Sequence, residues 1–128
     1  MQVPDYTLYY EPGAASMLVH LALLEIGVPY RLVRVVFDSD AQHQPAYLDL
    51  NPLGVVPTLL IDGKPLRESA ALMLILAERH PEAGLAPEAG STARDEWHQW
   101  AVQPVGHASS GGAGHTCSGR SSPVSTCR

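Results

Sequence analysis

The segment 51–69 constrains the fold of this chain more than any other stretch, because the signals of a strand, a tight turn and a helix start follow one another in it. Pro57 directly precedes the β-rich run Thr58–Ile61, and a proline is tolerated at the first residue of a strand. Asp62-Gly63 is typical of a two-residue type I′ hairpin, which needs positive φ at both central positions. The segment therefore predicts a β-hairpin that leads into a helix.

The residues after the hairpin predict a helix with a polar start. Most residues in 70–78 are strong helix formers. Ser69 is placed to cap this helix, because a serine hydroxyl accepts a hydrogen bond from a free backbone N–H of the first turn. A helix start with free N–H groups and a hydroxyl is suited to an anion. The sequence therefore places a candidate anion site at Ser69.

The first third of the chain predicts a strand–helix–strand unit. Tyr6–Tyr10 and Tyr30–Val36 are rich in residues that favour strands. Between them, Ser16–Ile26 is almost wholly apolar and stops at Gly27, which is typical of a helix packed deeply against a sheet. Two strands joined in this way pair in parallel with a right-handed crossover. A short helix is expected later, around Pro45–Leu50.

Composition and charge narrow the class of protein. A length of 128 residues predicts a single domain. Residues 1–100 carry 6 Lys/Arg against 13 Asp/Glu, and an acidic body without a basic patch argues against nucleic acid as a partner. No apolar run is long enough to cross a bilayer, and no basic segment precedes an apolar core at the N-terminus. We therefore expect a cytoplasmic protein that does not bind membranes.

Residues 101–128 differ in kind from the rest of the chain. They contain no Leu, Ile, Met or aromatic residue and many Ser and Gly, so they cannot bury enough apolar surface to offset the entropy lost on ordering. We expect a disordered tail. Cys117 and Cys127 both lie in it, at a spacing that matches no zinc pattern, so no metal site is predicted.

A short helical pattern precedes this tail. Thr92 followed by Asp95 is typical of a capping box, and the pattern continues over residues 92–100 before it stops. The abrupt change of composition at Ala101 leads to the hypothesis that the C-terminus is truncated or out of frame.

Three motifs in this order give the chain a family resemblance. It resembles the glutathione transferase superfamily, in particular the N-terminal half of a bacterial member, over about residues 6–100. The motifs are Tyr9-Tyr10-Glu11-Pro12-Gly13-Ala14-Ala15-Ser16, Asn51-Pro52-Leu53-Gly54-Val55-Val56-Pro57-Thr58-Leu59 and Glu68-Ser69-Ala70-Ala71-Leu72. The resemblance implies an α/β fold, the thioredoxin-like βαβαββα domain, over residues 4–82. A linker at 83–91 and the start of an all-α second domain at 92–100 would follow, before the tail at 101–128.

The resemblance also implies a glutathione site. The family holds the bond corresponding to Val56–Pro57 in cis, so that the backbone of Val56 pairs with the cysteinyl backbone of glutathione, like an added strand. Ser69 and the neighbouring helix N–H groups would hold the α-carboxylate of the γ-glutamyl group, and Glu68 would meet its ammonium. His43 lies in the loop that often contacts the glycine carboxylate in this family.

Two hydroxyls compete for the role of thiol activator. Ser16, at the start of the first helix, and Tyr10, at the end of the first strand, both match positions that activate the thiol in members of this superfamily. Many bacterial relatives carry cysteine where this chain has Ala15, so a mixed disulfide with glutathione is excluded there. Lowering a thiol pKa of about 8.5 by two units takes about 2.7 kcal/mol. One hydrogen bond to a charged group supplies about 1.5–3 kcal/mol, so a single hydroxyl nearly suffices.

These observations leave functions of different classes. The resemblance implies an enzyme, a glutathione transferase that activates the thiol of glutathione, its co-substrate, for attack on a small hydrophobic electrophile. A glutathione-binding module without catalysis, or an inactive remnant, are the alternatives if the helical domain is missing. Family members form homodimers through both domains, so dimerisation is left open.

Overall fold

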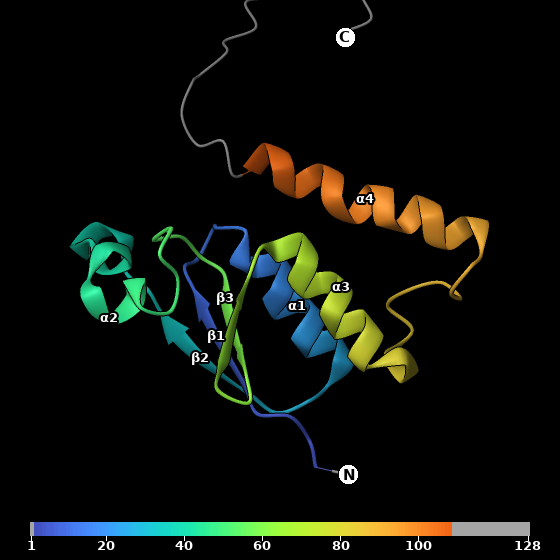
Figure 1. Ribbon diagram of the computed structural model, residues 1–128, viewed down its shortest axis with the longest axis horizontal. Coiled ribbons are helices and arrows are strands. Elements are labelled where there is room, and N and C mark those ends of the chain that lie inside the picture. Colours follow the sequence, from blue (N-terminus) through green and yellow to red (C-terminus); the bar gives the residue numbers. More distant parts are fainter. Residues whose placement is uncertain (1, 109–128) are drawn as a thin grey trace, which may run out of the picture.

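The computed structural model describes residues 2–108, with side chains placed for residues 2–103. Four strands form one mixed sheet in the order β2-β1-β3-β4, and helices α1 and α3 pack side by side along one face of it (Figure 1). The strands are β1 Tyr6–Tyr10, β2 Tyr30–Arg34, β3 Thr58–Ile61 and β4 Lys64–Arg67. The helices are α1 Ser16–Ile26, α2 Pro45–Leu48, α3 Ser69–Arg79 and α4 Thr92–Ala108, with short 3-10 turns at Phe37–Ser39, Ala41–His43 and Pro81–Ala83. This order confirms the thioredoxin-like α/β fold.

The register of the sheet brings three loops to one end of the domain. β1 pairs in parallel with β2, where Tyr10 lies opposite Arg34. β1 also pairs antiparallel with β3, where Tyr9 lies opposite Thr58. Thr58 in turn lies opposite Arg67 at the end of β4. The chain leaving β1, the chain entering β3 and the chain leaving β4 therefore meet at the same end of the sheet.

The hairpin has the turn that its sequence predicts. Asp62 and Gly63 have φ of 51° and 81°, which is positive at both central positions. The turn is also tied to the start of the chain, because the Asp62 N–H donates to the Asp5 carbonyl at 2.9 Å. The Asp5 N–H donates to the Asp62 carboxylate at 2.9 Å.

The main core lies between the sheet and the two long helices. Its fully or nearly buried members come from one face of β1 and β3 and from the facing stripes of α1 and α3: Tyr6, Leu8, Val19, Ala22, Leu23, Leu59, Ile61, Leu72 and Leu76. A second, smaller cluster consists of Val35, Tyr47 and Val56. Tyr9 packs against it from the face of β1 opposite the main core. Since neighbouring residues of a strand point to opposite faces, Leu8 and Tyr9 belong to different clusters.

Helix α1 is buried along one stripe only, although its sequence predicts deep burial. Val19 and Leu23 have no exposed surface, whereas Met17, Leu21 and Leu24 are 52%, 57% and 54% exposed. The sheet covers only one side of α1, and α3 covers part of another. In the described part of the chain, other elements therefore bury only some of the apolar side chains of α1.

Helix α4 departs from its prediction at both ends. Its first turn is capped by Ser91 rather than Thr92, because the Ser91 hydroxyl accepts from the Arg94 N–H at 3.1 Å. It runs to Ala108, eight residues past the expected boundary at Trp100. The predicted boundary rested on the loss of large apolar residues after Trp100. The remainder of the predicted tail lies outside the described residues.

Within residues 2–108, no helix combines the length and the apolar character that crossing a membrane requires.

The one-sided burial of α1 predicts a sharp contrast between neighbouring leucines. Leu23→Ala removes a fully buried side chain from the core, and we expect it to lower the free energy of unfolding by about 2–5 kcal/mol. Leu24→Ala, at an exposed position, should change it by less than about 1 kcal/mol. Urea unfolding followed by circular dichroism measures both. Equal losses for the two variants would contradict this orientation of α1.

Candidate functional site

The residues predicted to form a site gather at the end of the sheet where the three loops meet. Tyr10 ends β1, the bond between Val56 and Pro57 precedes β3, and Glu68 follows β4. Ser16 begins α1 directly after the loop from β1. Figure 1 shows that α1 and α3 both start at this end of the sheet. The fold therefore places the starts of both helices at the end of the sheet where the chain enters β3.

The bond between Val56 and Pro57 is cis, as expected from the resemblance. Val56 lies two residues before the first ladder residue of β3 and is 8% exposed. Among the hydrogen bonds of the described residues, none involves the N–H or C=O of Val56. These two groups are the kind that an extended ligand backbone can pair with, as an added strand does.

A buried polar network holds the residue before this bond. The hydroxyl of Tyr47 donates to the Val55 carbonyl at 2.6 Å, and the side-chain N–H of Asn51 donates to the same carbonyl at 2.8 Å. Both also contact the Thr58 hydroxyl, at 2.8 and 3.2 Å. The side-chain oxygen Oδ1 of Asn51 accepts from the Leu53 N–H at 3.1 Å. We call Tyr47, Asn51 and Thr58 the Val55 clamp.

The Val55 clamp is almost completely withdrawn from water. Asn51 and Thr58 have no exposed surface and Tyr47 is 5% exposed, and this burial raises the pKa of the Tyr47 phenol. Its hydrogen bonds therefore form in a low-dielectric setting, where a satisfied polar network fixes a single geometry. Sequence reasoning missed the clamp. Asn51 stands at the head of a motif, but Tyr47 comes from α2 and only the fold brings it to Val55.

Residues 68 and 69 start α3 in an unusual way. Glu68 has φ 69° and ψ 110°, a region that non-glycine residues rarely occupy, and such residues cluster at functional sites. Its carbonyl accepts the first helical bond, from the Leu72 N–H at 2.9 Å. Ser69 is the first residue inside the helix and is 2% exposed, and its side chain makes no cap bond. The prediction of Ser69 as the capping residue was therefore wrong, because Glu68 takes that position.

Ser16 and Tyr10 occupy different environments at the start of α1. The Ser16 hydroxyl has no exposed surface, donates to the Glu11 carbonyl at 3.1 Å and accepts from the Glu11 N–H at 3.2 Å. Its single proton is thus engaged within the loop. Tyr10 is half-buried, with its ring centroid 6.3 Å from that of His20. None of the hydrogen bonds among the described residues uses its hydroxyl.

An ion pair borders the same loop. The Arg34 guanidinium donates two hydrogen bonds to the Glu11 carboxylate, from Nε at 3.0 Å and from Nη2 at 2.9 Å. Through these bonds Arg34 lowers the pKa of Glu11, and Glu11 raises the pKa of Arg34. The ion pair links the end of β2 to the loop between β1 and α1.

His43 lies in the loop between β2 and α2, not at the start of α3. Its ring packs against the motif that contains the cis bond, since a Cβ added to Gly54 would lie 2.9 Å from His43 Cδ2. Gly54 has φ 62°, so both its backbone and this close approach favour glycine. The other side of the ring pairs through Nδ1 with the carboxylate of Asp40.

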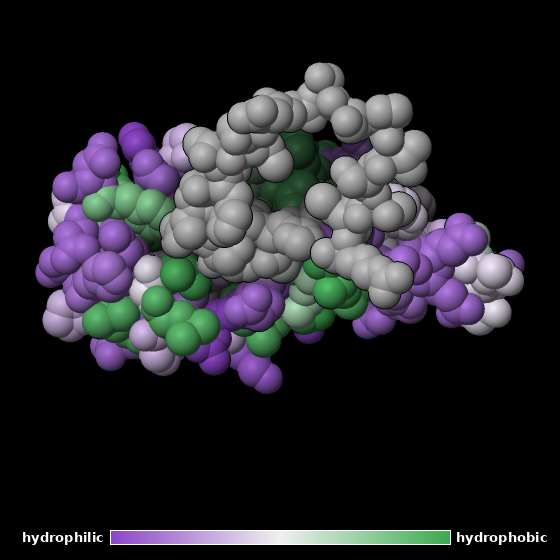
Figure 2. All heavy atoms as spheres, turned by 90° about the horizontal axis from the view of Figure 1, so that it is seen from above, coloured by the Kyte–Doolittle hydropathy of each residue, from purple (hydrophilic) through white to green (hydrophobic). Residues whose placement is uncertain are grey.

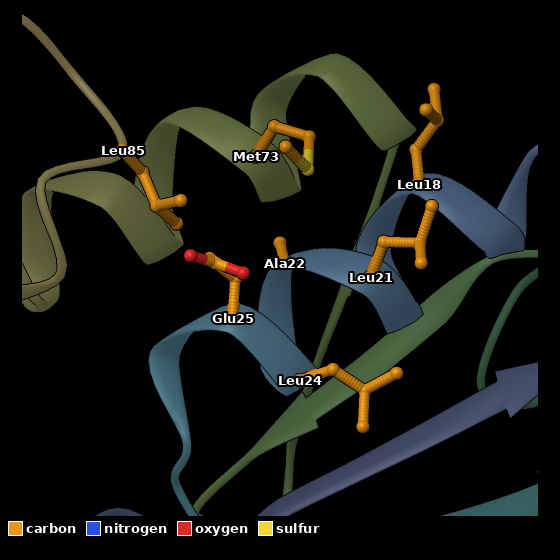
Figure 3. A pocket seen from close by; sticks show the side chains of 7 residues that line it. All are labelled: Leu18, Leu21, Ala22, Leu24, Glu25, Met73 and Leu85. Carbon is orange, nitrogen blue, oxygen red and sulfur yellow. The ribbon is translucent and has the colours of Figure 1, made fainter.

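An open apolar groove of about 400 Å³ runs between α1 and α3 (Figure 3). Leu18 and Leu21 of α1 face Met73 of α3 across it, with Leu85 at one end. The carboxylate of Glu25 also borders the groove. Seen from above, apolar side chains lie among polar ones on the part of the surface that the described residues form (Figure 2). The groove offers contact area for apolar groups rather than polar chemistry.

Within the described residues, no three His, Cys, Asp or Glu side chains are grouped so that they could hold a metal ion. Cys117 and Cys127 lie outside the described residues.

The family model of the glutathione S-transferase N-terminal domain matches residues 15–79. Glutathione S-transferase GST-4.5 of Xanthomonas campestris is 36% identical over 93 residues, which cover 73% of this chain and 45% of that protein. A maleylacetoacetate isomerase of Rhizobium meliloti is 41% identical over 78 residues, 61% of this chain and 37% of that protein.

Solved structures match over the same part of the chain. A glutathione transferase homologue from Sulfitobacter, crystallised with bound glutathione, has a TM-score of 0.68 and 39% identity over 77% of this chain and 49% of that one. The ternary complex of BphK, a bacterial GST, has a TM-score of 0.65 and 43% identity over 74% of this chain and 48% of that one. The chain thus spans about half the length of the bacterial transferases that it matches.

The Val55 clamp predicts that Asn51 matters more than its exposed neighbour. Asn51→Ala removes three hydrogen bonds from a buried network, and we expect a loss of about 1–3 kcal/mol in the free energy of unfolding. Leu53→Ala changes a residue of the same loop that is 64% exposed, and it should cost less than about 0.5 kcal/mol. Denaturant titrations compare the two. A loss of stability for Asn51→Ala as small as that for Leu53→Ala would show that the clamp contributes no stability.

Proposed function

The chain belongs to the glutathione S-transferase family, and from this premise we propose that it binds reduced glutathione and activates its thiol for attack on a small apolar electrophile. The observation that carries the proposal is the backbone before Pro57. Among the described residues, no hydrogen bond uses the N–H or C=O of Val56, and the Val55 clamp holds the preceding carbonyl. This arrangement supplies a rigid segment of backbone, to which an extended peptide can add as a strand.

In this proposal the two ends of the tripeptide have separate partners. The γ-glutamyl carboxylate is held at the start of α3 by Ser69 and its neighbouring N–H groups, where the helix dipole favours an anion. The exposed side chain of Glu68 meets the ammonium of the same group. His43 contacts the glycine carboxylate, and its packing against Gly54 supports this role by placing its ring beside the motif that precedes Val56.

The thiol is activated by a hydroxyl at the end of β1 or the start of α1. Tyr10 and Ser16 are both candidates, and the contacts of this structure favour Tyr10. The Ser16 proton already bonds the Glu11 carbonyl, so donation to a thiolate would require that bond to be broken. Among the described residues, no hydrogen bond uses the Tyr10 hydroxyl. One charge-assisted hydrogen bond supplies about 1.5–3 kcal/mol, enough to lower a thiol pKa by one to two units.

A glutathione-binding module without catalysis is the second candidate. The open groove between α1 and α3 favours it, because an enzyme that aligns an apolar electrophile with a thiol needs a pocket that encloses the co-substrate. Since the chain spans about half the length of the transferases that it matches, the activity of those whole proteins is a proposal for this chain.

Binding at the start of α3 predicts a contrast along that helix. Glu68→Gln should weaken the binding of reduced glutathione several-fold, because the ammonium loses its carboxylate partner. Glu78→Gln changes an exposed glutamate near the other end of the same helix and should leave the affinity unchanged. Isothermal titration calorimetry measures both. Equal affinities for these two variants and the wild-type chain would remove Glu68 from the site.

The choice between the two hydroxyls is tested by the ionisation of bound glutathione. Tyr10→Phe should raise the thiol pKa toward the value of about 8.5 for a free thiol, while Ser16→Ala should leave it low unless the loop is disturbed. Thiolate absorbance in the ultraviolet, recorded across a pH series, reports this pKa. The reverse result, with Ser16→Ala alone raising it in a folded protein, would transfer the role to Ser16.

A further inference from the structure

The ion pair between Arg34 and Glu11 stands beside the two candidate thiol activators. Glu11 directly follows Tyr10, and its backbone N–H and C=O are the two partners of the Ser16 hydroxyl. The Glu11 side chain is only 15% exposed, whereas Arg34 is 51% exposed. The acidic group of the pair is thus the one turned into the protein.

The register of the sheet places Arg34 on the same face as Tyr10. The two residues lie opposite each other at the ends of the parallel strands β1 and β2, and side chains paired in this way point to the same face. Asp38, in the 3-10 turn beyond β2, is a further charged group near the guanidinium. The carboxylates of Glu11 and Asp38 and the phenol of Tyr10 therefore lie around Arg34. The two hydrogen bonds of its guanidinium both go to Glu11.

A carboxylate at this position opposes the formation of a thiolate nearby. Two like charges in a partly desolvated site repel each other, and the pKa of the weaker acid rises. A guanidinium bonded to the carboxylate through two parallel hydrogen bonds cancels most of its charge at short range. The sign of the effect on a neighbouring thiol therefore depends on whether the pair is intact.

We propose that Arg34 is a positioning residue of the thiol site, and that it neutralises Glu11 so that the thiolate of glutathione can form beside the β1–α1 loop. This inference rests on the proposed function, since it requires glutathione to bind with its sulfur near Tyr10 and Ser16. It gives Arg34 and Glu11 a role at the thiol site, whichever hydroxyl activates the thiol. It also predicts that the two members of the pair act on the thiol with opposite signs.

The test measures the thiol pKa of bound glutathione in a set of charge variants. Arg34→Gln exposes the thiol to an unpaired Glu11, and we expect the pKa to rise by about one unit, a tenfold loss of thiolate at a given pH below it. Glu11→Gln should leave the pKa unchanged or lower it, because Arg34 is then free to attract the thiolate. The double variant should return close to wild type, and Arg34→Lys should keep most of the effect of the cation.

Arg31 supplies the matched control. It lies on the same strand and forms an ion pair with Asp5 at the opposite end of β2, so Arg31→Gln should leave the thiol pKa unchanged. Circular dichroism of each variant reports folding. If Arg34→Gln does not fold, Glu11→Gln carries the test, because a pKa above wild type in that variant overturns the inference.

The outcomes separate this inference from the proposed function. A wild-type chain that binds no glutathione overturns both. A wild-type chain that binds glutathione, with an unchanged thiol pKa in folded Arg34→Gln, overturns the inference alone. A rise of the pKa in both single variants would assign the pair a purely mechanical role in holding the loop, which also contradicts charge neutralisation.

Discussion

The geometry of the candidate glutathione site depends on the two hydrogen bonds that hold the carbonyl of Val55. Tyr47 and Asn51 donate both from positions that water does not reach, and Thr58 connects their side chains. A satisfied network in a low-dielectric interior fixes one arrangement, whereas a half-satisfied one costs stability. The clamp sets where the chain enters β3, and β3 in turn sets the register with β1 and β4. The end of the sheet that gathers the site residues is thus held by buried polar contacts as well as by the apolar core.

The elements with strong local signals could be predicted from the sequence. β1 and α1 have their expected bounds, because a β-rich run and an apolar helix stopped by Gly27 are each defined by neighbouring residues. The Asp62-Gly63 turn follows from its need for positive φ, and the parallel pairing of β1 with β2 follows from the helix between them. In these cases the physical cause lies within a few residues of the effect. The cis bond between Val56 and Pro57, by contrast, was implied only by the family resemblance.

The contacts that decide the roles of single side chains could not be predicted in this way. Tyr47 reaches Val55 only after α2 folds beside the entry to β3, and the sequence has no pattern for that contact. Ser16 matches a family position, but its burial and its bonds to Glu11 are properties of the folded loop. Ser69 has the residue type of a helix cap, yet Glu68 occupies the cap position with positive φ. Arg34 and Glu11 are 23 residues apart, and only the sheet register makes them neighbours.

We propose that glutathione binds where the loop before β3 meets the start of α3. The most direct measurement is a titration of the isotopically labelled chain with reduced glutathione, followed through its backbone amide NMR signals. We expect saturable shifts at Val56 and Ser69, with little change at Leu21 and Leu24 on the open face of α1. Shifts confined to that face of α1, or no shifts at all from a folded chain, would contradict it.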